Sequence, residues 1–85
     1  MANISEFEPV EVIVYFSGIN ANIIKFKWRG GVYKVTEMLQ SWKIPSRDGH
    51  EFHYVVTCKE SDLLCELSFS NQDMKWQLVR YDSME

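Results

Sequence analysis

Apolar and polar residues alternate along most of the chain with a period of two. The clearest example is residues 24–29, where three apolar side chains alternate with three basic ones: Ile24, Phe26 and Trp28 against Lys25, Lys27 and Arg29. Successive side chains of a β-strand point to opposite faces. This pattern therefore predicts a strand with one apolar face and one charged face.

The same alternation predicts five further strands, separated by short segments of turn-forming residues. They are expected at residues 9–16, 32–42, 52–58, 63–69 and 76–81. Gly30 and Gly31 accept the positive φ that the centre of a tight hairpin turn needs, so the strands on either side of them should form a hairpin. Pro45 lacks a backbone N–H, and we expect the third strand to end in the loop at residues 44–49.

The segment from Val35 to Trp42 fits two structures. Its apolar residues also have the spacing of one helix face, and Thr36 could cap a short helix. A strand with a bulge is favoured, because Val35 and Leu39 still fit period two and the segment is short for a helix. A short helical turn at residues 36–42 is the alternative.

The 85 residues have room for one hydrophobic core, so we expect a single all-β domain over residues 1–85 with frayed ends at 1–7 and 83–85. Six short strands best bury their apolar faces as a small antiparallel barrel or a strongly coiled sheet, because either form also hides strand edges. The three tryptophans are expected in the core: Trp28, Trp42 and Trp76.

The net charge of −3 argues against a surface that attracts nucleic acid or anionic lipid over its whole extent, so any basic site must be local. The sequence holds no apolar run of about 18 residues and begins without the pattern of a secretory signal. We therefore expect a cytoplasmic protein that does not bind membranes. In that compartment Cys58 and Cys65 should be buried free thiols rather than a disulfide.

The search for reactive groups gives no catalytic, cofactor or metal site. His50 and His53 are three residues apart on a predicted strand and so project to opposite faces, which excludes a metal-binding pair. Ser46 and Asp48 share a loop with His50, but a loop does not hold a nucleophile and its base rigidly. Glu66 alternates with apolar neighbours and is expected to face solvent. A protein that is not an enzyme is the interpretation these residues favour.

One local cluster of charge stands out. Lys25, Lys27 and Arg29 share a face of the predicted strand, and Lys34 lies within reach on the next strand. A basic strip with nearby aromatic residues is typical of a sheet that binds nucleic acid. The alternative is the ordinary solvated face of an amphipathic strand, on which lysines also discourage edge-to-edge pairing.

Several motifs resemble those of a family of short bacterial proteins of unknown function. The most specific is Phe26-x-Trp28-Arg29-Gly30-x-x-Tyr33-x-Val35, and weaker matches continue to Asp82. Relatives of that family also occur as C-terminal pieces or neighbours of Y-family translesion DNA polymerase-like proteins. The chain departs from the pattern at Gly31, where the family usually has a basic residue. The resemblance implies no catalytic residues, and it implies an accessory role near DNA repair.

Two functions follow from these observations. The first is a non-catalytic interaction module that docks on another protein through a sheet face or edge. The alternative is a nucleic-acid-associated accessory module, linked to DNA repair or translesion synthesis, that uses the basic strip. No pattern in the sequence sets an oligomeric state.

Overall fold

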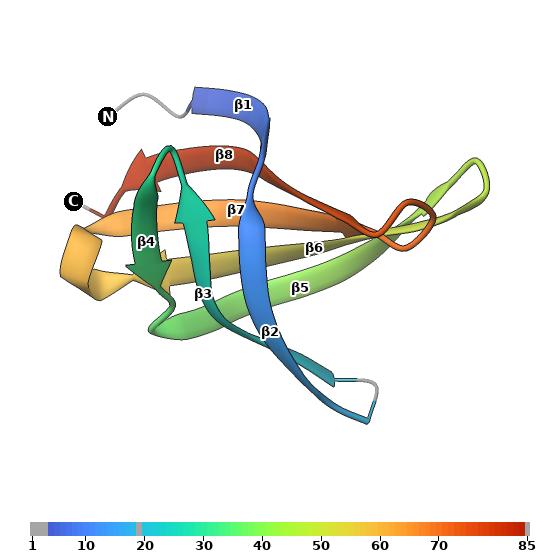
Figure 1. Ribbon diagram of the computed structural model, residues 1–85, viewed down its shortest axis with the longest axis horizontal. Coiled ribbons are helices and arrows are strands. Elements are labelled where there is room, and N and C mark those ends of the chain that lie inside the picture. The colour runs from blue at the N-terminus through green and yellow to red at the C-terminus, as the bar shows by residue number, and fades with distance from the viewer. Residues whose placement is uncertain (1–3, 19, 85) are drawn as a thin grey trace.

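The computed structural model describes residues 4–18 and 20–84, which form two antiparallel β-sheets (Figure 1). A five-stranded sheet has the order β1-β8-β7-β6-β5, and a three-stranded sheet has the order β2-β3-β4. The eight strands are β1 (Ile4–Pro9), β2 (Glu11–Ser17), β3 (Asn20–Trp28), β4 (Gly31–Lys34), β5 (Glu37–Ser46), β6 (Gly49–Cys58), β7 (Leu63–Ser70) and β8 (Lys75–Ser83). A 3₁₀ turn, η1 (Lys59–Ser61), joins β6 to β7. The all-β prediction is confirmed.

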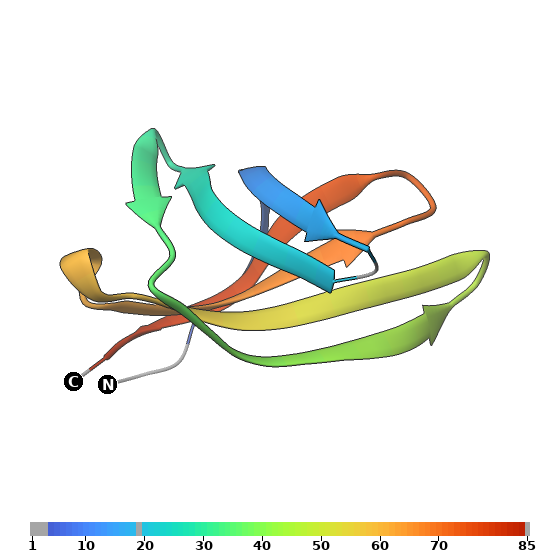
Figure 2. The ribbon, with the colours of Figure 1, turned by 90° about the horizontal axis from the view of Figure 1, so that it is seen from below.

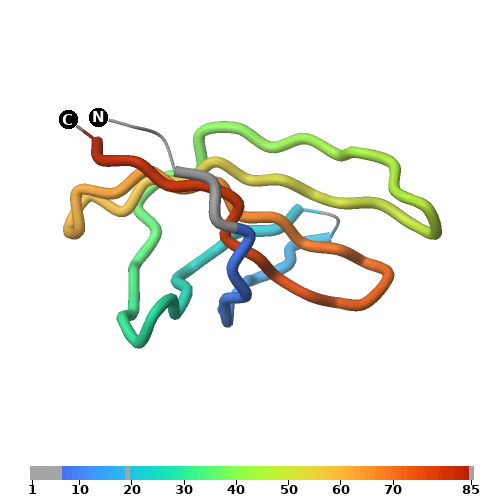
Figure 3. Tube along the Cα trace, turned by 90° about the horizontal axis from the view of Figure 1, so that it is seen from above, coloured from blue at the N-terminus to red at the C-terminus, as the bar shows by residue number. Residues whose placement is uncertain are grey.

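The prediction of six strands is wrong, and the described residues do not close into a barrel. The chain passes twice from one sheet to the other almost without a break, between β1 and β2 at Val10 and between β4 and β5. In the second crossing the Val35 N–H donates to Ile24 in the three-stranded sheet, and the next N–H, that of Thr36, donates to Thr57 in the five-stranded sheet. Figure 3 follows the chain from β4 directly into β5. The alternation of side chains continues through this bend, so the sequence pattern predicts one strand where the structure has β4 and β5.

Strands β1 and β8 extend into the two ends of the chain. Strand β1 pairs with β8 over part of the range expected to fray, and Ser83 ends β8. Residues 1–3 and 85 lie outside the described residues, as does Ile19 in the turn between β2 and β3.

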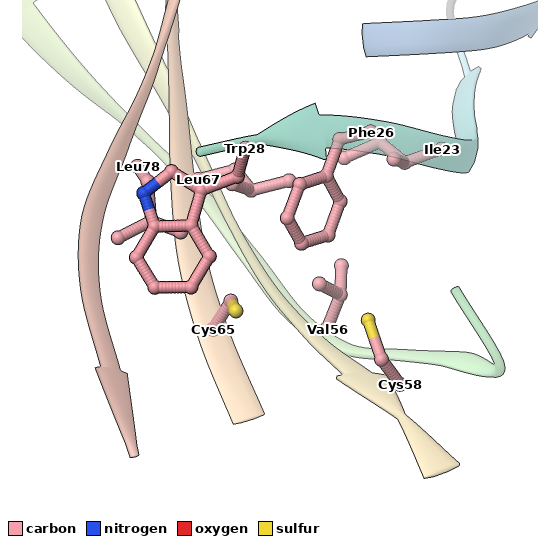
Figure 4. Packing of buried hydrophobic residues seen from close by; sticks show 8 residues of the cluster. All are labelled: Ile23, Phe26, Trp28, Val56, Cys58, Cys65, Leu67 and Leu78. Carbon is pink, nitrogen blue, oxygen red and sulfur yellow. The ribbon is translucent and has the colours of Figure 1, made fainter. Parts of the chain in front are cut away.

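The core lies between the two sheets, where the three-stranded sheet crosses one face of the five-stranded sheet (Figures 1 and 2). Phe26 and Trp28 of β3 point down onto the inner face of the larger sheet (Figure 4). The other buried residues of this core are Ile23, Val56, Cys58, Cys65, Leu67 and Leu78. Both cysteines are free thiols within this core.

Two bulges decide which apolar residues reach the core. In the pairing of β2 with β3, Val14 lies opposite Ile23 and the preceding residue opposite Lys25, so Ile24 is left over. Ile23 is therefore buried at 4% exposure, whereas Ile24 is 48% exposed, contrary to the prediction that it faces inward. A second bulge in β5 leaves Leu39 at 52% exposure. The strand with a bulge predicted there is confirmed, and the helical turn at residues 36–42 is wrong.

Two turns also differ from the predictions. Trp28 pairs with Gly31, so Arg29 and Gly30, both with positive φ, form the centre of the β3–β4 turn in place of the glycine pair. Pro45 does not end its strand, because β5 continues to Ser46. Strand β5 is at the edge of its sheet, so one side of its backbone has no neighbouring strand. A proline whose missing N–H would point to that side removes no hydrogen bond from the sheet.

No helix in the described part of the chain is long and apolar enough to cross a membrane.

Candidate functional site

Three of the four predicted basic residues lie together on the outer face of the three-stranded sheet. Lys25 is directly opposite Lys34 in the β3–β4 pair, and Lys27 is the next residue of β3 on the same face. We call Lys25, Lys27 and Lys34 the lysine face. Within residues 4–18 and 20–84 none of these three makes an ion pair. Exposed apolar side chains lie beside them, Ile13 on β2 and Val32 on β4.

Arg29 does not join the lysine face. Its guanidinium lies 4.7 Å from the centre of the Trp28 ring, and it donates to Glu8 through Nε at 3.0 Å and Nη2 at 2.5 Å. The Trp28 indole N–H donates to the same carboxylate at 2.7 Å. These charge-assisted bonds tie the β3–β4 turn to β1, so Arg29 has a structural role.

A groove of about 720 Å³ separates the start of β3 from β5. It is open because β4 pairs with β3 only from Lys25 to Trp28, whereas β5 follows β6 away from the smaller sheet (Figure 2). Two strand edges therefore face each other across the groove. Its walls are Ser17, Asn20, Ala21 and Asn22 on one side and residues 38–43 on the other, and its floor includes Phe52 and Tyr54.

In the described part of the chain, β5 is the last strand of its sheet, so the wall that it forms presents backbone groups without a strand partner. A two-residue turn joins Ser46 to Gly49, which makes them a hydrogen-bonded pair of the β5–β6 ladder. Hydrogen-bonded and non-hydrogen-bonded pairs alternate from there, so Ser41 and Lys43 direct their N–H and C=O groups away from β6. Pro45 has the same orientation but no N–H to offer. The edge of β5 can therefore accept another strand over residues 40–44.

Aromatic residues line the inner face of the larger sheet beneath the groove. The ring centroids of Phe52 and Phe69 are 6.4 Å apart, those of Phe69 and Trp76 are 4.9 Å apart, and those of Trp76 and Tyr54 are 5.8 Å apart. All four are half-buried. Burial raises the pKa of the Tyr54 phenol, which keeps that group neutral. Half-buried aromatic rings with a polar tip are typical of binding surfaces.

The outer face of the larger sheet holds a polar cluster that the sequence analysis missed. Glu66, expected in solvent, is 7% exposed. Its Oε2 lies 2.7 Å from His53 Nδ1, and its Oε1 forms an ion pair with Arg80 Nε at 3.0 Å. Trp42, expected in the core, stacks on His53 instead, with centroids 5.4 Å apart, and is 38% exposed. Both predictions are wrong.

The cluster joins three adjacent strands, since His53 belongs to β6, Glu66 to β7 and Arg80 to β8. Both oxygens of the carboxylate are engaged, which indicates a structural role. One signal in the sequence points to it. Leu63, Leu64 and Cys65 form an apolar run without alternation, as in strands that are buried on both faces.

Among the described residues, no three His, Cys, Asp or Glu side chains come together as ligands for a metal. Comparisons of this chain with known protein families, with curated proteins and with solved structures found no match.

Proposed function

We propose that this domain is a non-catalytic protein-interaction module that binds an extended segment of a partner protein in the groove between its two sheets. The observation that carries the proposal is the free edge of β5. Ser41 and Lys43 offer outward backbone groups there, beside the half-buried rings of Phe52 and Tyr54. An added strand gains main-chain hydrogen bonds from such an edge and specificity from the neighbouring side chains.

Features at both ends of this edge favour the binding of one short segment over unselective pairing with other strand edges. Pro45 prevents a full ladder at one end, and the bulge at Leu39 interrupts it at the other. Natural sheets use prolines and bulges in this way to limit association between edges. The part of β5 between them is left for a short segment.

Peptide selection tests the proposal. Random peptides of about nine residues are displayed and selected on the immobilised domain, and their affinities are measured for the wild type, Ser41→Pro and Ser41→Ala. Proline removes an outward N–H while alanine keeps it, so we expect Ser41→Pro to weaken binding about fivefold, the effect of one net hydrogen bond, and Ser41→Ala to leave it unchanged.

A second variant blocks the groove from the opposite wall. Asn22 lines the groove from β3 and is exposed, so Asn22→Trp fills the space without altering β5. We expect it to abolish binding while circular dichroism shows an intact fold. Selected peptides that bind all variants equally, or a selection that yields none, would contradict the proposal.

A specific observation favours a second function, that of a nucleic-acid-associated accessory module. Lys25 and Lys34 are directly opposite each other, an arrangement that opposes folding because like charges repel across a strand pair. An anionic partner would relieve that repulsion, and Tyr15, 63% exposed on β2, could stack on an unpaired base. Residues 26–35 resemble a family of unknown function, relatives of which occur as C-terminal pieces or neighbours of Y-family polymerase-like proteins, and this supports a role in DNA repair or translesion synthesis.

Charge reversal on the lysine face tests this second function. The variant Lys25→Glu/Lys27→Glu/Lys34→Glu keeps Arg29, which binds Glu8. If three lysines contact phosphates, wild-type binding to a single-stranded oligonucleotide should fall with salt at a logarithmic slope of about −2. The triple variant should not bind. No binding by the wild type at about 50 mM salt would exclude this function.

A further inference from the structure

We infer that the segment bound in the groove carries an acidic residue opposite Lys43, flanked on each side by an apolar residue. The inference rests on the proposed function, because it assumes that an extended segment pairs with β5. It adds to that function the chemical type of the three central residues of the bound segment.

The acidic residue follows from the charge of the groove. Lys43 is the one charged side chain among the described residues that line it, and it makes no ion pair within that part of the chain. Lys43 lies directly opposite Phe52 in the β5–β6 pair and so belongs to the inner face of the sheet. An antiparallel segment places one of its side chains directly beside Lys43, and opposite charges stabilise such a cross-strand pair.

The apolar residues follow from the other face of the same stretch. Trp42 and Ile44 precede and follow Lys43, point to the outer face, and are 38% and 42% exposed. The neighbours of the acidic residue in an antiparallel segment lie opposite these two side chains. Apolar side chains at those positions remove the exposed surface of Trp42 and Ile44 from water, which favours binding.

The length of the segment follows from the two interruptions of β5. Pairing ends before Pro45, which has no N–H, and cannot continue regularly past the bulge at Leu39. Residues 40–44 therefore pair with about five residues of the partner, a stretch of about 17 Å. The ligand class is a short, extended segment with the central pattern apolar, acidic, apolar.

Labelled synthetic peptides test this pattern by fluorescence anisotropy. The probe is Ser-Thr-Val-Asp-Val-Thr-Ser with blocked ends, and the comparison peptides have Asn or Lys in place of Asp. At about 50 mM salt, where exposed charges are weakly screened, we expect the Asp peptide to bind the wild type about tenfold more tightly than the Lys peptide. The preference should shrink as salt is added.

Variants of Lys43 assign that preference to one residue. Lys43→Glu should reverse it, and Lys43→Met should reduce it to less than about twofold, because the methionine keeps an unbranched side chain of similar length and removes the charge. Lys34→Glu is the matched control, since it makes the same charge change on the lysine face. We expect Lys34→Glu to bind the peptides as the wild type does.

Each failure has a distinct meaning. A preference for Asp that survives in Lys43→Glu would overturn the inference, as would a wild type that binds none of the three peptides. The proposed function stands if Ser41→Pro and Asn22→Trp weaken binding of the selected library peptides and those peptides carry no acid. Library peptides that bind independently of the groove would overturn the function and the inference together.

Discussion

Trp28 and Trp42 occupy opposite environments, although both belong to predicted strands. Trp28 is 6% exposed, packs 4.8 Å from the Tyr81 ring and donates to Glu8, whereas Trp42 is 38% exposed on the outer face. We expect Trp28→Ala to lower the free energy of unfolding by about 3 kcal/mol or more, as truncation of a buried aromatic residue does. Trp42→Ala should cost about 1 kcal/mol or less. Urea denaturation of both variants measures the difference, and equal midpoints would contradict the assignment of the core.

Glu66 is buried between His53 and Arg80, so its removal takes away the partner of His53 Nδ1 and the ion-pair partner of Arg80. We expect Glu66→Ala to lower the free energy of unfolding by about 2 kcal/mol, less than for a wholly buried pair because half of the Arg80 side chain is in solvent. Glu51→Ala is the control. The Glu51 carboxylate also lies near His53, at 3.3 Å, but its side chain is 46% exposed. Denaturation curves that shift equally for the two variants would show that burial of Glu66 does not matter.

At the scale of elements, the β3–β4 hairpin depends on its turn. Gly30 has φ of +80°, a conformation that costs an L-residue about 1–2 kcal/mol. We expect Gly30→Ala to destabilise the domain by about 1 kcal/mol, although a Cβ there would meet no atom within 4 Å. Thermal unfolding measures the loss. An unchanged melting temperature would mean that the turn relaxes without cost.

The elements also show how far alternation predicts structure. Strand type was predictable for most of the chain, because side chains on β3 and β6 follow period two where one face is buried. The bulge at Ile24 was not, and the bulge expected within residues 35–42 could not be placed at Leu39, since an extra residue is recognised only against the strand that pairs with it. The continuation of β5 through Pro45 was not predictable either, because proline is tolerated there only since β5 is an edge strand.

At the scale of the whole molecule, the two sheets bury the cysteines between them, and this makes the stability of the fold decrease at alkaline pH. Burial raises the pKa of Cys58 from 9.0 to about 11. Burial, with a smaller contribution from Cys58, raises the pKa of Cys65 to about 12. Above pH 9 the unfolded chain loses these protons while the folded chain keeps them, so the stability they contribute is full below pH 9 and declines as pH rises toward 11.

We therefore expect the free energy of unfolding to fall between pH 9 and 11 by up to about 1.4 kcal/mol per pH unit for each thiol. The double variant Cys58→Ala/Cys65→Ala lacks this contribution but keeps Tyr54 and the lysines. Its stability should decline with pH less steeply than that of the wild type in matched urea titrations. Parallel slopes would refute the burial of the thiols as the cause.

The candidate sites also differ in how far the sequence predicts them. The lysine face was predictable except for Arg29, because residues 25 and 27 alternate with buried aromatics on one strand. The groove was not, since its walls come from the starts of β3 and β5, which only the divergence of the two sheets places opposite each other. The cluster around Glu66 likewise joins three strands whose register no local pattern fixes.

The sequence by itself determined that this chain is an all-β domain, because a period of two along each strand reflects local backbone geometry and the burial of one face. The tertiary structure alone decided the number of strands, the residues that bulges turn outward and the edges left unpaired. Those features depend on which strands meet and in what register, and that is settled by packing between residues far apart in the chain. The edge of β5 and the groove beside it, on which the proposed function rests, belong to this second group.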